Sequence, residues 1–506
     1  MLAAVSSFGL SGIDAYPVTV EADLSRGLPA FEIVGLPDAA VKEARDRVRA
    51  AMKNTGLEFP TARIVLNLAP ADRKKSGAAY DLAILLAILK ASGALGADLS
   101  GFGILGELSL GGELRPLPGV LPMVLGAGAL GLREVIVPFD NAPEGAVAQD
   151  VEVYAAKTVG EVLEHLRGGQ RLPRCGAIPS EQAPLPPVPD YADVKGQAEA
   201  KRAVTVAAAG MHNLLLLGPP GSGKSMLARR LPSILPPPGY AEQVETTKLH
   251  SVAGLLPRGV GLMAQRPFRS PHHSISAAGM AGGGVSPRPG EVSLAHHGVL
   301  FLDELPEFNR NVLEVMRQPL EDGEVSISRL GGIYRFPADF MLVAARNPCP
   351  CGQYPDMNRC TCTVRQIRNY NARISKPLLD RIDINVDVRK VDCRQLFGGR
   401  TGKNSAEMRE SVLRTQRIQS ERFSGENIRF NSQMDSALCS KYVVLDGEAK
   451  NFMEDCFADM DMTARGAYRV LKIARTIADL DGDPEVGIKH LREAVFFRNA
   501  DIQGGV

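Results

Sequence analysis

The sequence predicts an α/β protein in three parts: an N-terminal α/β domain, a central α/β domain around a glycine-rich loop, and a C-terminal helical domain. Three observations predict it. Strand-like runs alternate with helical patterns over residues 1–170, an all-apolar run leads into the glycine-rich loop within 191–391, and helical periodicity dominates 400–506. A chain of 506 residues is also too long for one ordinary domain.

The N-terminal part alternates between strand-like and helical patterns. We expect three strands and one strongly apolar helix, at residues 31–34, 63–68, 135–137 and 81–90. Asp38 can cap a further helix, which has its apolar positions on one face and which Gly56 ends. The uncharged run between Arg115 and Arg133 contains three prolines and is short for a membrane span, so we interpret it as a loop followed by a buried helix.

Two breaks separate the three parts. A proline-rich stretch at 171–190 favours an extended spacer, and a glycine-rich stretch at 398–402 ends the central part. Beyond the second break, residues 464–480 carry apolar side chains at the spacing of one buried helical face.

Composition limits how this chain can bind other molecules. The 58 Lys and Arg residues nearly cancel 57 Asp and Glu residues, so any binding of nucleic acid must use local positive charge. The chain has no tryptophan and only 5% aromatic residues, which argues against aromatic stacking as the main mode of binding. Asp14 interrupts the apolar N-terminus, and eight cysteines make no disulfide framework in a chain this long, so we expect a cytoplasmic protein without a membrane segment.

The central part contains a phosphate-loop pattern in the context that this pattern requires. The apolar run 214–217 is typical of a buried parallel strand, and a helix at 226–230 is expected after the loop. Backbone N–H groups of such a loop close around phosphates, Lys224 reaches the β- and γ-phosphates, and Ser225 is a ligand of Mg²⁺. The expected nucleotide contacts are Gly218, Pro219, Pro220, Gly221, Ser222, Gly223, Lys224 and Ser225.

Two further apolar runs end in polar residues that suit the same site. The run 299–302 ends at Asp303, which can hold the Mg²⁺ hydration shell, and Glu304, which can polarise the attacking water. The run 340–345 is followed by Asn347, which could orient that water, although Asn-Pro is also an ordinary turn signal.

Long blocks of the chain resemble one family, the magnesium-chelatase-like AAA+ ATPases, and within it the bacterial ComM/YifB branch. The resemblance covers nearly the whole chain and implies ATP and Mg²⁺ as cofactors. It rests on DVKGQ at 193–197, HNLLLLGPPGSGKSMLA at 212–228, PGEVSLAHHGVLFLDELPE at 289–307 and NPCPCG at 347–352.

The resemblance also implies roles for single residues. Asn347 falls at the sensor-1 position, Arg381 in a segment that resembles the one with the arginine finger, and Arg465 on a helix that resembles sensor 2. An arginine finger acts on the nucleotide of a neighbouring subunit, so a homo-hexameric ring is implied as well. From the residues alone, Arg381 could instead pair with Asp380 or Asp383 on the surface.

Members of this branch are understood as hexameric helicases that drive branch migration while single strands are integrated during natural transformation. The resemblance therefore implies single-stranded or branched DNA, and recombination proteins, as partners. A β-hairpin expected at 324–336, with Arg329 and Arg335 near its tip, is a candidate for contacts to phosphates. The alternative is an exposed hairpin whose arginines are only solvated.

The N-terminal part resembles the Lon-protease domain, a fold of the ribosomal S5 domain 2 type, through the blocks 67–81 and 103–119. Lon proteases use a serine activated by a lysine. Here Ala78 and Ala79 stand where the serine is expected, and residues 121–123 offer no lysine. We predict a catalytically inactive domain that serves assembly or an interaction with DNA or protein partners.

A cysteine cluster follows Asn347. Four thiolates in so short a segment can bind a structural Zn²⁺ ion, although C-x-C is tighter than the usual C-x₂-C spacing. A reduced loop without metal is the alternative. The histidine pairs 272–273 and 296–297 are expected as loop and strand-edge residues near the site, where metal binding is not expected. The candidate zinc ligands are Cys349, Cys351, Cys360 and Cys362.

Two rival functions share the ATPase core. One is a magnesium-chelatase motor subunit that couples ATP hydrolysis to metal insertion, although such subunits are not expected to carry a Lon-like unit at 1–170. The other is an ATP-dependent scaffold or regulatory protein without protease activity.

Overall fold

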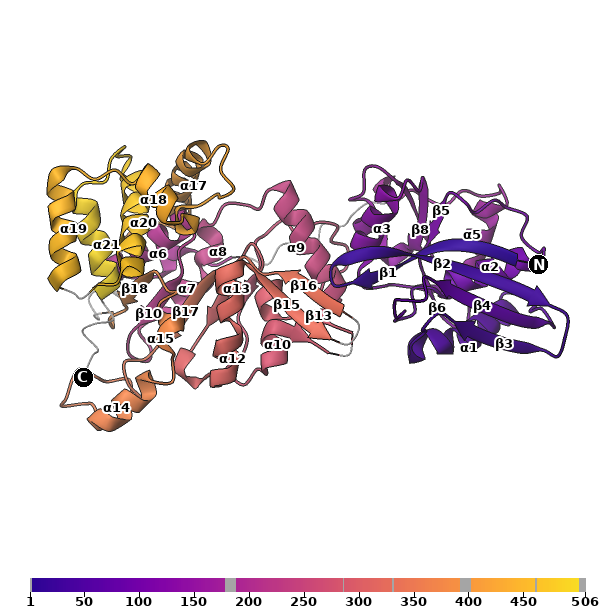
Figure 1. Ribbon diagram of the computed structural model, residues 1–506, viewed down its shortest axis with the longest axis horizontal. Coiled ribbons are helices and arrows are strands. Elements are labelled where there is room, and N and C mark those ends of the chain that lie inside the picture. The colour runs from indigo at the N-terminus through magenta and orange to yellow at the C-terminus, as the bar shows by residue number, and fades with distance from the viewer. Residues whose placement is uncertain are drawn as a thin grey trace.

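The three parts of the chain lie in a row in the computed structural model, with the N-terminal domain at one end and the C-terminal helices at the other (Figure 1). The structure describes residues 2–177, 188–284, 286–329, 332–391, 402–459 and 462–499. No helix within these residues is long and apolar enough to cross a membrane. Half of the expected spacer at 171–190 and most of the glycine-rich break at 398–402 lie outside the described residues.

A seven-stranded mixed sheet in the order β3-β4-β2-β1-β5-β8-β9 forms the N-terminal domain. β2 pairs antiparallel with β1 and β4, and all other neighbours in this sheet are parallel. The three strands expected here are confirmed as β3, β4 and β8, but the long hairpin of the first two strands was not foreseen. The strands are β1 Leu2–Ser11, β2 Asp14–Ser25, β3 Ala30–Val34, β4 Arg63–Ala69, β5 Phe102–Ile104, β8 Glu134–Pro138 and β9 Glu152–Ala156.

Helices cover this sheet because their apolar faces need burial. Asp38 caps the first helix by accepting a hydrogen bond from the Val41 backbone N–H at 2.9 Å, as expected. The apolar helix expected at 81–90 and the buried helix expected after residue 115 are confirmed as the second and third helices. The helices are α1 Ala39–Asn54, α2 Asp81–Ala91, α3 Val120–Ala129, α4 Ala142–Gly145 and α5 Val159–Leu166, and a small hairpin is formed by β6 Glu107–Leu108 and β7 Leu114–Arg115.

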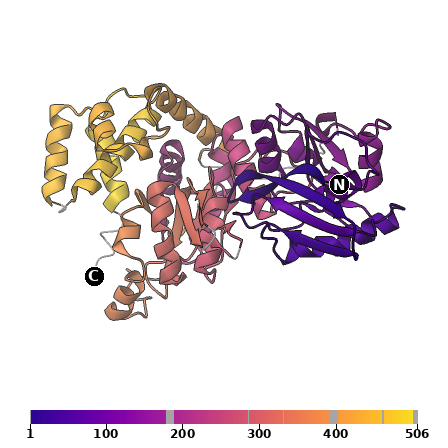
Figure 2. The same cartoon turned by 45° about the vertical axis from the view of Figure 1, so that its right-hand side comes forward.

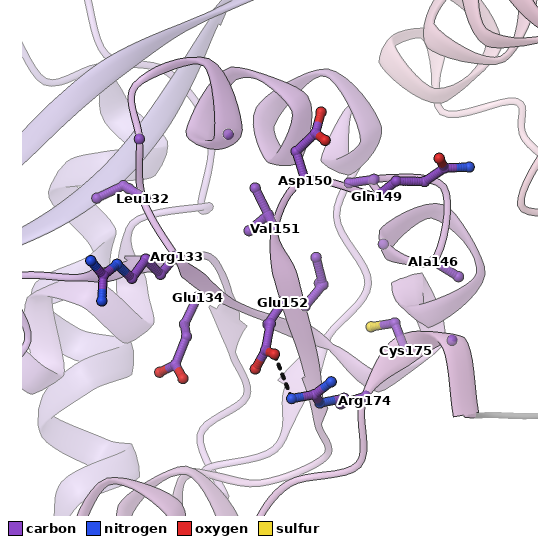
Figure 3. Close-up of a pocket in the computed structure, with 16 residues that line it drawn as sticks. Leu132, Arg133, Glu134, Ala146, Gln149, Asp150, Val151, Glu152, Arg174 and Cys175 are labelled. Carbon is purple, nitrogen blue, oxygen red and sulfur yellow. Dashed lines mark hydrogen bonds and ion pairs between the residues drawn. The ribbon is translucent and has the colours of Figure 1, made fainter.

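The chain remains packed on this domain as far as Ala177. The Pro173 carbonyl accepts from the Ala155 N–H at 3.1 Å, Arg174 pairs with Glu152 of β9, and Cys175 is buried. Figure 3 shows Arg174 and Cys175 beside an open cavity of about 950 Å³. This cavity lies in the N-terminal domain, away from the glycine-rich loop at 218–225, so it is separate from the site that the sequence predicts.

The central domain is built on a five-stranded parallel sheet in the order β11-β14-β17-β10-β18. Alternate residues of the central strands enter two separate cores on the two faces of the sheet, which explains why their sequences are apolar throughout. The strands are β10 Leu214–Leu217, β11 Phe268–Arg269, β14 Val299–Leu302, β17 Met341–Arg346 and β18 Ile384–Asp387.

Helices and two short hairpins surround this sheet. The helix after the glycine-rich loop begins at Lys224, two residues before its expected start. The helices are α6 Ala198–Gly210, α7 Lys224–Arg229, α8 Leu231–Ile234, α9 Tyr240–Ala253, α10 Ala277–Ala281, α11 Glu291–Leu294, α12 Arg310–Val315, α13 Arg317–Asp322, α14 Val364–Asn371 and α15 Lys376–Leu379. The hairpins are β12 Gly282–Gly283 with β13 Arg288–Pro289, and β15 Glu324–Arg329 with β16 Gly332–Pro337.

The C-terminal part is helical, as predicted, and shares one hydrophobic core with α6 and one face of the central sheet. The helix expected at 464–480 is confirmed. The helices are α17 Ser405–Arg422, α18 Ser436–Tyr442, α19 Gly447–Asp459, α20 Ala464–Asp481 and α21 Ile488–Asn499.

A buried polar joint connects the N-terminal domain to the central domain, where α3 and α9 lie side by side in both ribbon views (Figures 1 and 2). The Glu144 carboxylate accepts hydrogen bonds from the Leu121 N–H at 3.0 Å, the Asn141 amide at 2.9 Å and the Ser251 hydroxyl at 2.6 Å. Ser251 belongs to α9, and its own carbonyl accepts from the Gly119 N–H at 3.0 Å. All these partners are buried, so the joint is a hydrogen-bonded contact between the two domains that is shielded from water.

Replacing Glu144 by alanine should loosen this joint. Three buried donors would lose their acceptor, at a cost of about 3 kcal/mol or more. Calorimetry should show a lower unfolding temperature, whereas the exposed Glu113→Ala should have little effect. An unchanged unfolding temperature in Glu144→Ala would contradict a stabilising role for the joint.

Candidate functional site

The glycine-rich loop joins β10 to α7 in a strand–loop–helix arrangement. Gly221 and Gly223 have left-handed backbones, with φ of +73° and +97°, where a side chain would be strained. A Cβ at Gly218 would collide with the Val388 carbonyl after β18, so the loop passes close to the neighbouring strand. These conformations let consecutive backbone N–H groups face an anion at the start of α7.

Lys224 is held at the centre of the loop. Its ammonium donates hydrogen bonds to the Gly218 carbonyl at 2.7 Å, the Pro219 carbonyl at 3.0 Å and the Asn347 side-chain oxygen at 3.0 Å. Burial lowers the pKa of Lys224, and the carboxylates of Asp303 and Glu304 oppose this shift. A positive charge partly removed from water binds phosphate oxygens more strongly than an exposed one.

Ser225 and Asp303 form a second contact across the site. The Ser225 hydroxyl donates to a carboxylate oxygen of Asp303 at 2.6 Å. Asp303 follows β14 and Ser225 lies in the first turn of α7, so two elements distant in the sequence bring these oxygens together. Hydroxyl and carboxylate oxygens are the ligands that Mg²⁺ prefers, and the pair therefore fits a magnesium ion bound with a nucleotide.

Glu304 follows Asp303 with an unusual backbone. Its φ is +52°, a left-handed conformation that is uncommon outside glycine and is found at strained functional positions. Its side chain is exposed and lies 3.9 Å from Nδ1 of His273, measured between the carboxylate oxygen and the ring nitrogen. The histidine pair 272–273 was expected to lie near the site, and His273 does lie beside Glu304, close after the carboxyl end of β11.

Arg381 and Arg465 lie at the opposite edge of the sheet from the phosphate loop. Both line a cavity of about 850 Å³ together with Asn213 and Phe340, the residues immediately before β10 and β17. The phosphate loop and Asn347 follow the carboxyl ends of these same two strands. Because the six residues of β17 span about 20 Å, neither arginine can reach a nucleotide on the phosphate loop of its own chain.

Four basic side chains, including these two arginines, line the cavity together with five acidic ones. Burial lowers the pKa of Arg381, and the positive charges of Arg317 and Arg465 lower it further. Arg381 forms an ion pair with Glu321 and donates to the Pro377 carbonyl at 2.6 Å. Among the described residues its Nε, although buried, has no hydrogen-bond partner.

The surface pairing considered for Arg381 is not the one observed. Asp383 instead accepts from His212 at 3.3 Å and lies 3.6 Å from Arg469 of α20. Asp380 pairs with Arg498 at 3.8 Å.

A cavity of about 680 Å³, which no local sequence pattern indicates, lies beside the phosphate loop. It lies between Gln197, Lys201 and the helices α17 and α20, with Met408 and Leu480 in its wall. Gln197 connects the wall of this cavity to the phosphate loop, because its side-chain amide donates a hydrogen bond to the Ser222 carbonyl at 3.2 Å. Lys201 has a buried ammonium without a hydrogen-bond partner in the described part of the chain. A cavity with apolar walls next to a phosphate site suits a nucleoside base.

The hairpin predicted at 324–336 is present as β15 and β16, but the tip residues 330–331 lie outside the described residues. Arg329 pairs with Gly332 next to the tip, as predicted. Arg335 pairs with Ser326, three residue pairs farther down, so its expected place near the tip is wrong. Strand alternation also puts the two arginines on opposite faces of the ribbon, and the side chain of Arg335 is 71% exposed.

His296 and His297 both contact the Glu245 carboxylate, and the hydrogen bonds of His296 disfavour metal binding at this pair. Both Nε2 atoms contact one oxygen of Glu245, at 3.2 Å for His296 and 2.8 Å for His297. Nδ1 of His296 faces the Asp339 N–H at 3.0 Å and must therefore accept a hydrogen bond. Its Nε2 then carries the proton and cannot bind a metal ion.

The residues that a Lon protease would use for catalysis are apolar here or have other partners. Ala78 and Ala79 precede α2, and Leu121 and Met123 are buried in α3. Lys75, next to Ser76, is fully buried and donates to the Pro70 and Arg73 carbonyls.

Three family models match this chain, one for each part. "Subunit ChlI of Mg-chelatase" matches residues 20–141, "Magnesium chelatase, subunit ChlI" matches 190–396, and "Magnesium chelatase, subunit ChlI C-terminal" matches 402–498.

Relatives match over most of the chain. The competence protein ComM of Haemophilus influenzae is 44% identical over 504 residues, which cover 98% of this chain and 97% of ComM. The protein YifB of Escherichia coli is 41% identical over 493 residues, or 97% of this chain and 96% of YifB. The magnesium-chelatase 38 kDa subunit of Rhodobacter capsulatus is 23% identical over 328 residues, or 60% of this chain and 85% of that subunit.

Proposed function

Because this chain belongs to the ComM/YifB-type magnesium-chelatase-like AAA+ family, we propose that it is an ATP-driven motor that works on DNA as a hexameric ring. Membership of the family implies the use of ATP and Mg²⁺. The relative named for competence supports a role in natural transformation, where a branch-migration helicase would integrate single-stranded DNA with recombination proteins.

One observation supports the ring proposal: the residues that we assign to the two halves of the nucleotide site lie at opposite edges of one sheet. Lys224, Ser225 and Asp303 are at the carboxyl edge, whereas Arg381 and Arg465 are at the amino edge. One chain alone therefore has half of a site at each edge. Copies arranged head to tail would place the arginine cavity of one on the phosphate loop of the next, and a closed ring would complete every site.

The residues at the carboxyl edge divide the work of ATP hydrolysis between them. In this proposal the backbone N–H groups of 218–223 and the Lys224 ammonium bind the phosphates, while the cavity beside Gln197 takes the base. Ser225 and Asp303 hold Mg²⁺, which supplies charge neutralisation at the phosphates when it is bound. Glu304 accepts a proton from the attacking water, and Asn347 orients that water.

The hairpin of β15 and β16 is the proposed contact to DNA. Its base contributes Val325 and Phe336 to the core of the central domain, and its outer half carries exposed Ile333 and Arg335. The net charge of the chain is only +1, so local arginines must supply the attraction to phosphates. Contacts of this kind bind DNA without reading its sequence.

The direct test of the proposal is migration of a branched DNA substrate by the purified chain with ATP and Mg²⁺. We expect migration by the natural protein and none by Lys224→Ala. A protein that hydrolyses ATP yet neither binds nor moves any DNA structure would refute the DNA part of the proposal.

Replacing Arg329 or Arg335 by alanine should weaken binding of single-stranded DNA. The slope of log affinity against log salt should fall by about 0.7 for each lost phosphate contact. Filter binding over a salt series measures both effects, and Arg417→Ala on α17 is the charge-matched control. If both hairpin variants keep the slope of the natural protein, the hairpin does not contact the phosphates.

A chelatase motor subunit remains the second candidate, because all three matching family models carry that name. The 38 kDa chelatase subunit matches only 60% of this chain, however, whereas ComM matches 98%. Stimulation of the ATPase rate by DNA would favour the first candidate, and stimulation by a porphyrin would favour the second.

A further inference from the structure

Four cysteine sulfurs meet in the loop between β17 and α14. Sγ of Cys349 lies 3.4 Å from Sγ of Cys351 and 3.8 Å from Sγ of Cys360, and the last two are 3.6 Å apart. With Cys362, all four sulfurs lie within 4.8 Å of one another, and none is in a disulfide. The side chains of two C-x-C pairs, which are separated by eight residues, therefore converge on one point in the loop.

These separations match the edges of a tetrahedron around one ion. Zn–S bonds of about 2.3 Å directed to tetrahedral corners place the sulfurs about 3.8 Å apart. A polynuclear iron–sulfur cluster would hold its cysteines farther apart, because several iron atoms stand between them. Four thiolates around a single ion are the ligand set of a structural zinc site, which leaves no open position for catalysis.

Apart from the cysteine cluster, the loop has few packing contacts that could stabilise its conformation. Of residues 351–363 only Gly352 is buried, and Met357 is 65% exposed. The loop contains tight turns, such as the one closed by the Cys360 N–H and the Asp356 carbonyl at 2.8 Å, but no apolar core. Small irregular segments of this kind need a cross-link or a metal ion to keep one conformation.

The cluster sits against the nucleotide site. Asn347, two residues before Cys349, accepts a hydrogen bond from Lys224 at 3.0 Å. Gly352 packs on Pro220 of the phosphate loop, and a Cβ at Gly352 would collide with the proline ring. Gly352 also has a left-handed φ of +75°. A change in the conformation of the cysteine loop would therefore alter its contacts with Pro220 and Lys224 of the phosphate loop.

We propose that Cys349, Cys351, Cys360 and Cys362 bind one structural Zn²⁺ ion, which fixes the loop that supports Asn347 and the phosphate loop. The metal site stands on its own geometry, whereas its effect on nucleotide binding rests on the function proposed above. The ion does no chemistry on ATP. It holds Gly352 against Pro220 and keeps Asn347 beside Lys224.

Metal content tests the first half of the proposal. Protein purified under reducing conditions, or refolded with Zn²⁺, should hold about one zinc per chain by elemental analysis. A mercurial reagent that titrates the thiols should release it. The double variant Cys360→Ser/Cys362→Ser should lose the metal, whereas Cys456→Ser, a half-buried cysteine outside the cluster, should keep it.

Either of two results would overturn the assignment of zinc to this site, whatever the ATPase activity proves to be. One is natural protein that neither retains zinc nor takes it up on titration with ZnCl₂. The other is bound iron in place of zinc, seen as visible absorption of the purified protein.

Gly352→Ala tests the link to the nucleotide without removing a ligand. The variant should keep its zinc but bind a fluorescent ADP analogue about tenfold more weakly, because the new methyl group pushes on Pro220. Gly425→Ala is the matched control, since Gly425 has a similar left-handed backbone but open space around it. Unchanged affinity in Gly352→Ala would refute the link, even if the zinc site stands.

Discussion

Replacing Lys224 by alanine should abolish ATP binding and lower turnover by at least about a hundredfold, since a preorganised charge on the phosphates is lost. Lys224 is the cation whose ammonium lies inside the loop, between the Gly218 and Pro219 carbonyls. Binding of a fluorescent ATP analogue and release of phosphate measure the two effects separately. Each assay should be run with and without DNA, because a motor that works on DNA can need DNA for ATP turnover.

Glu304→Gln is the informative partner of this variant. The amide keeps the size of the side chain but cannot take a proton from water, so ATP should bind and remain unhydrolysed. Asp303 stays beside Ser225, and the metal ligands are untouched. Normal turnover in both variants would show that the chemistry is elsewhere in the molecule.

The parts of the site that follow local sequence rules could be predicted. The strand–loop–helix around Lys224 and the polar residues after β14 and β17 are each contained in a short segment. In a parallel sheet the carboxyl ends of neighbouring strands share one edge, which is why Asp303 and Asn347 meet the phosphate loop. Fully apolar runs predicted these strands because both faces of the sheet are buried.

The parts that depend on contacts between distant segments could not be predicted. No local pattern indicates that Gln197 borders a cavity with helices some two hundred residues later, or that Glu144 accepts a hydrogen bond from Ser251. The hairpin of β1 and β2 was missed as well, although its partner strand β4 was found. Its apolar residues alternate too weakly to stand out from a loop.

Positions within an element were predicted less well than the element itself. The β15–β16 hairpin was expected, yet its register places Arg335 beside Ser326 rather than near the tip. A one-residue error in the turn changes the face of every following side chain, and the two glycines at 331–332 left the turn position open.

The cysteine cluster shows the opposite case. Its tight C-x-C spacing made the geometry doubtful, whereas the structure brings all four sulfurs together.

Mixing two inactive variants, Arg381→Ala and Lys224→Ala, should restore activity. Each nucleotide site of the proposed ring lies at a seam, the contact between the phosphate loop of one chain and the arginine cavity of the next. A seam that joins the phosphate loop of the first variant to the arginine cavity of the second contains no substituted residue. In randomly mixed rings such seams are about a quarter of the total, so turnover of up to about a quarter of the natural rate is expected if seams act independently. Phosphate release by the mixture, against each variant alone, is the measurement.

The pair Arg381→Ala with Arg465→Ala decides whether the two arginines serve the same seam. Both line one cavity at the amino edge of the sheet, so each seam needs both from one chain, and no chain in this mixture has both. The mixture should stay inactive, whereas Arg465→Ala mixed with Lys224→Ala should recover. Recovery of the two-arginine mixture would mean that Arg465 reaches the nucleotide of its own chain. The helical domain would then have to swing around the sheet, away from the position in which α20 pairs with Asp383 through Arg469.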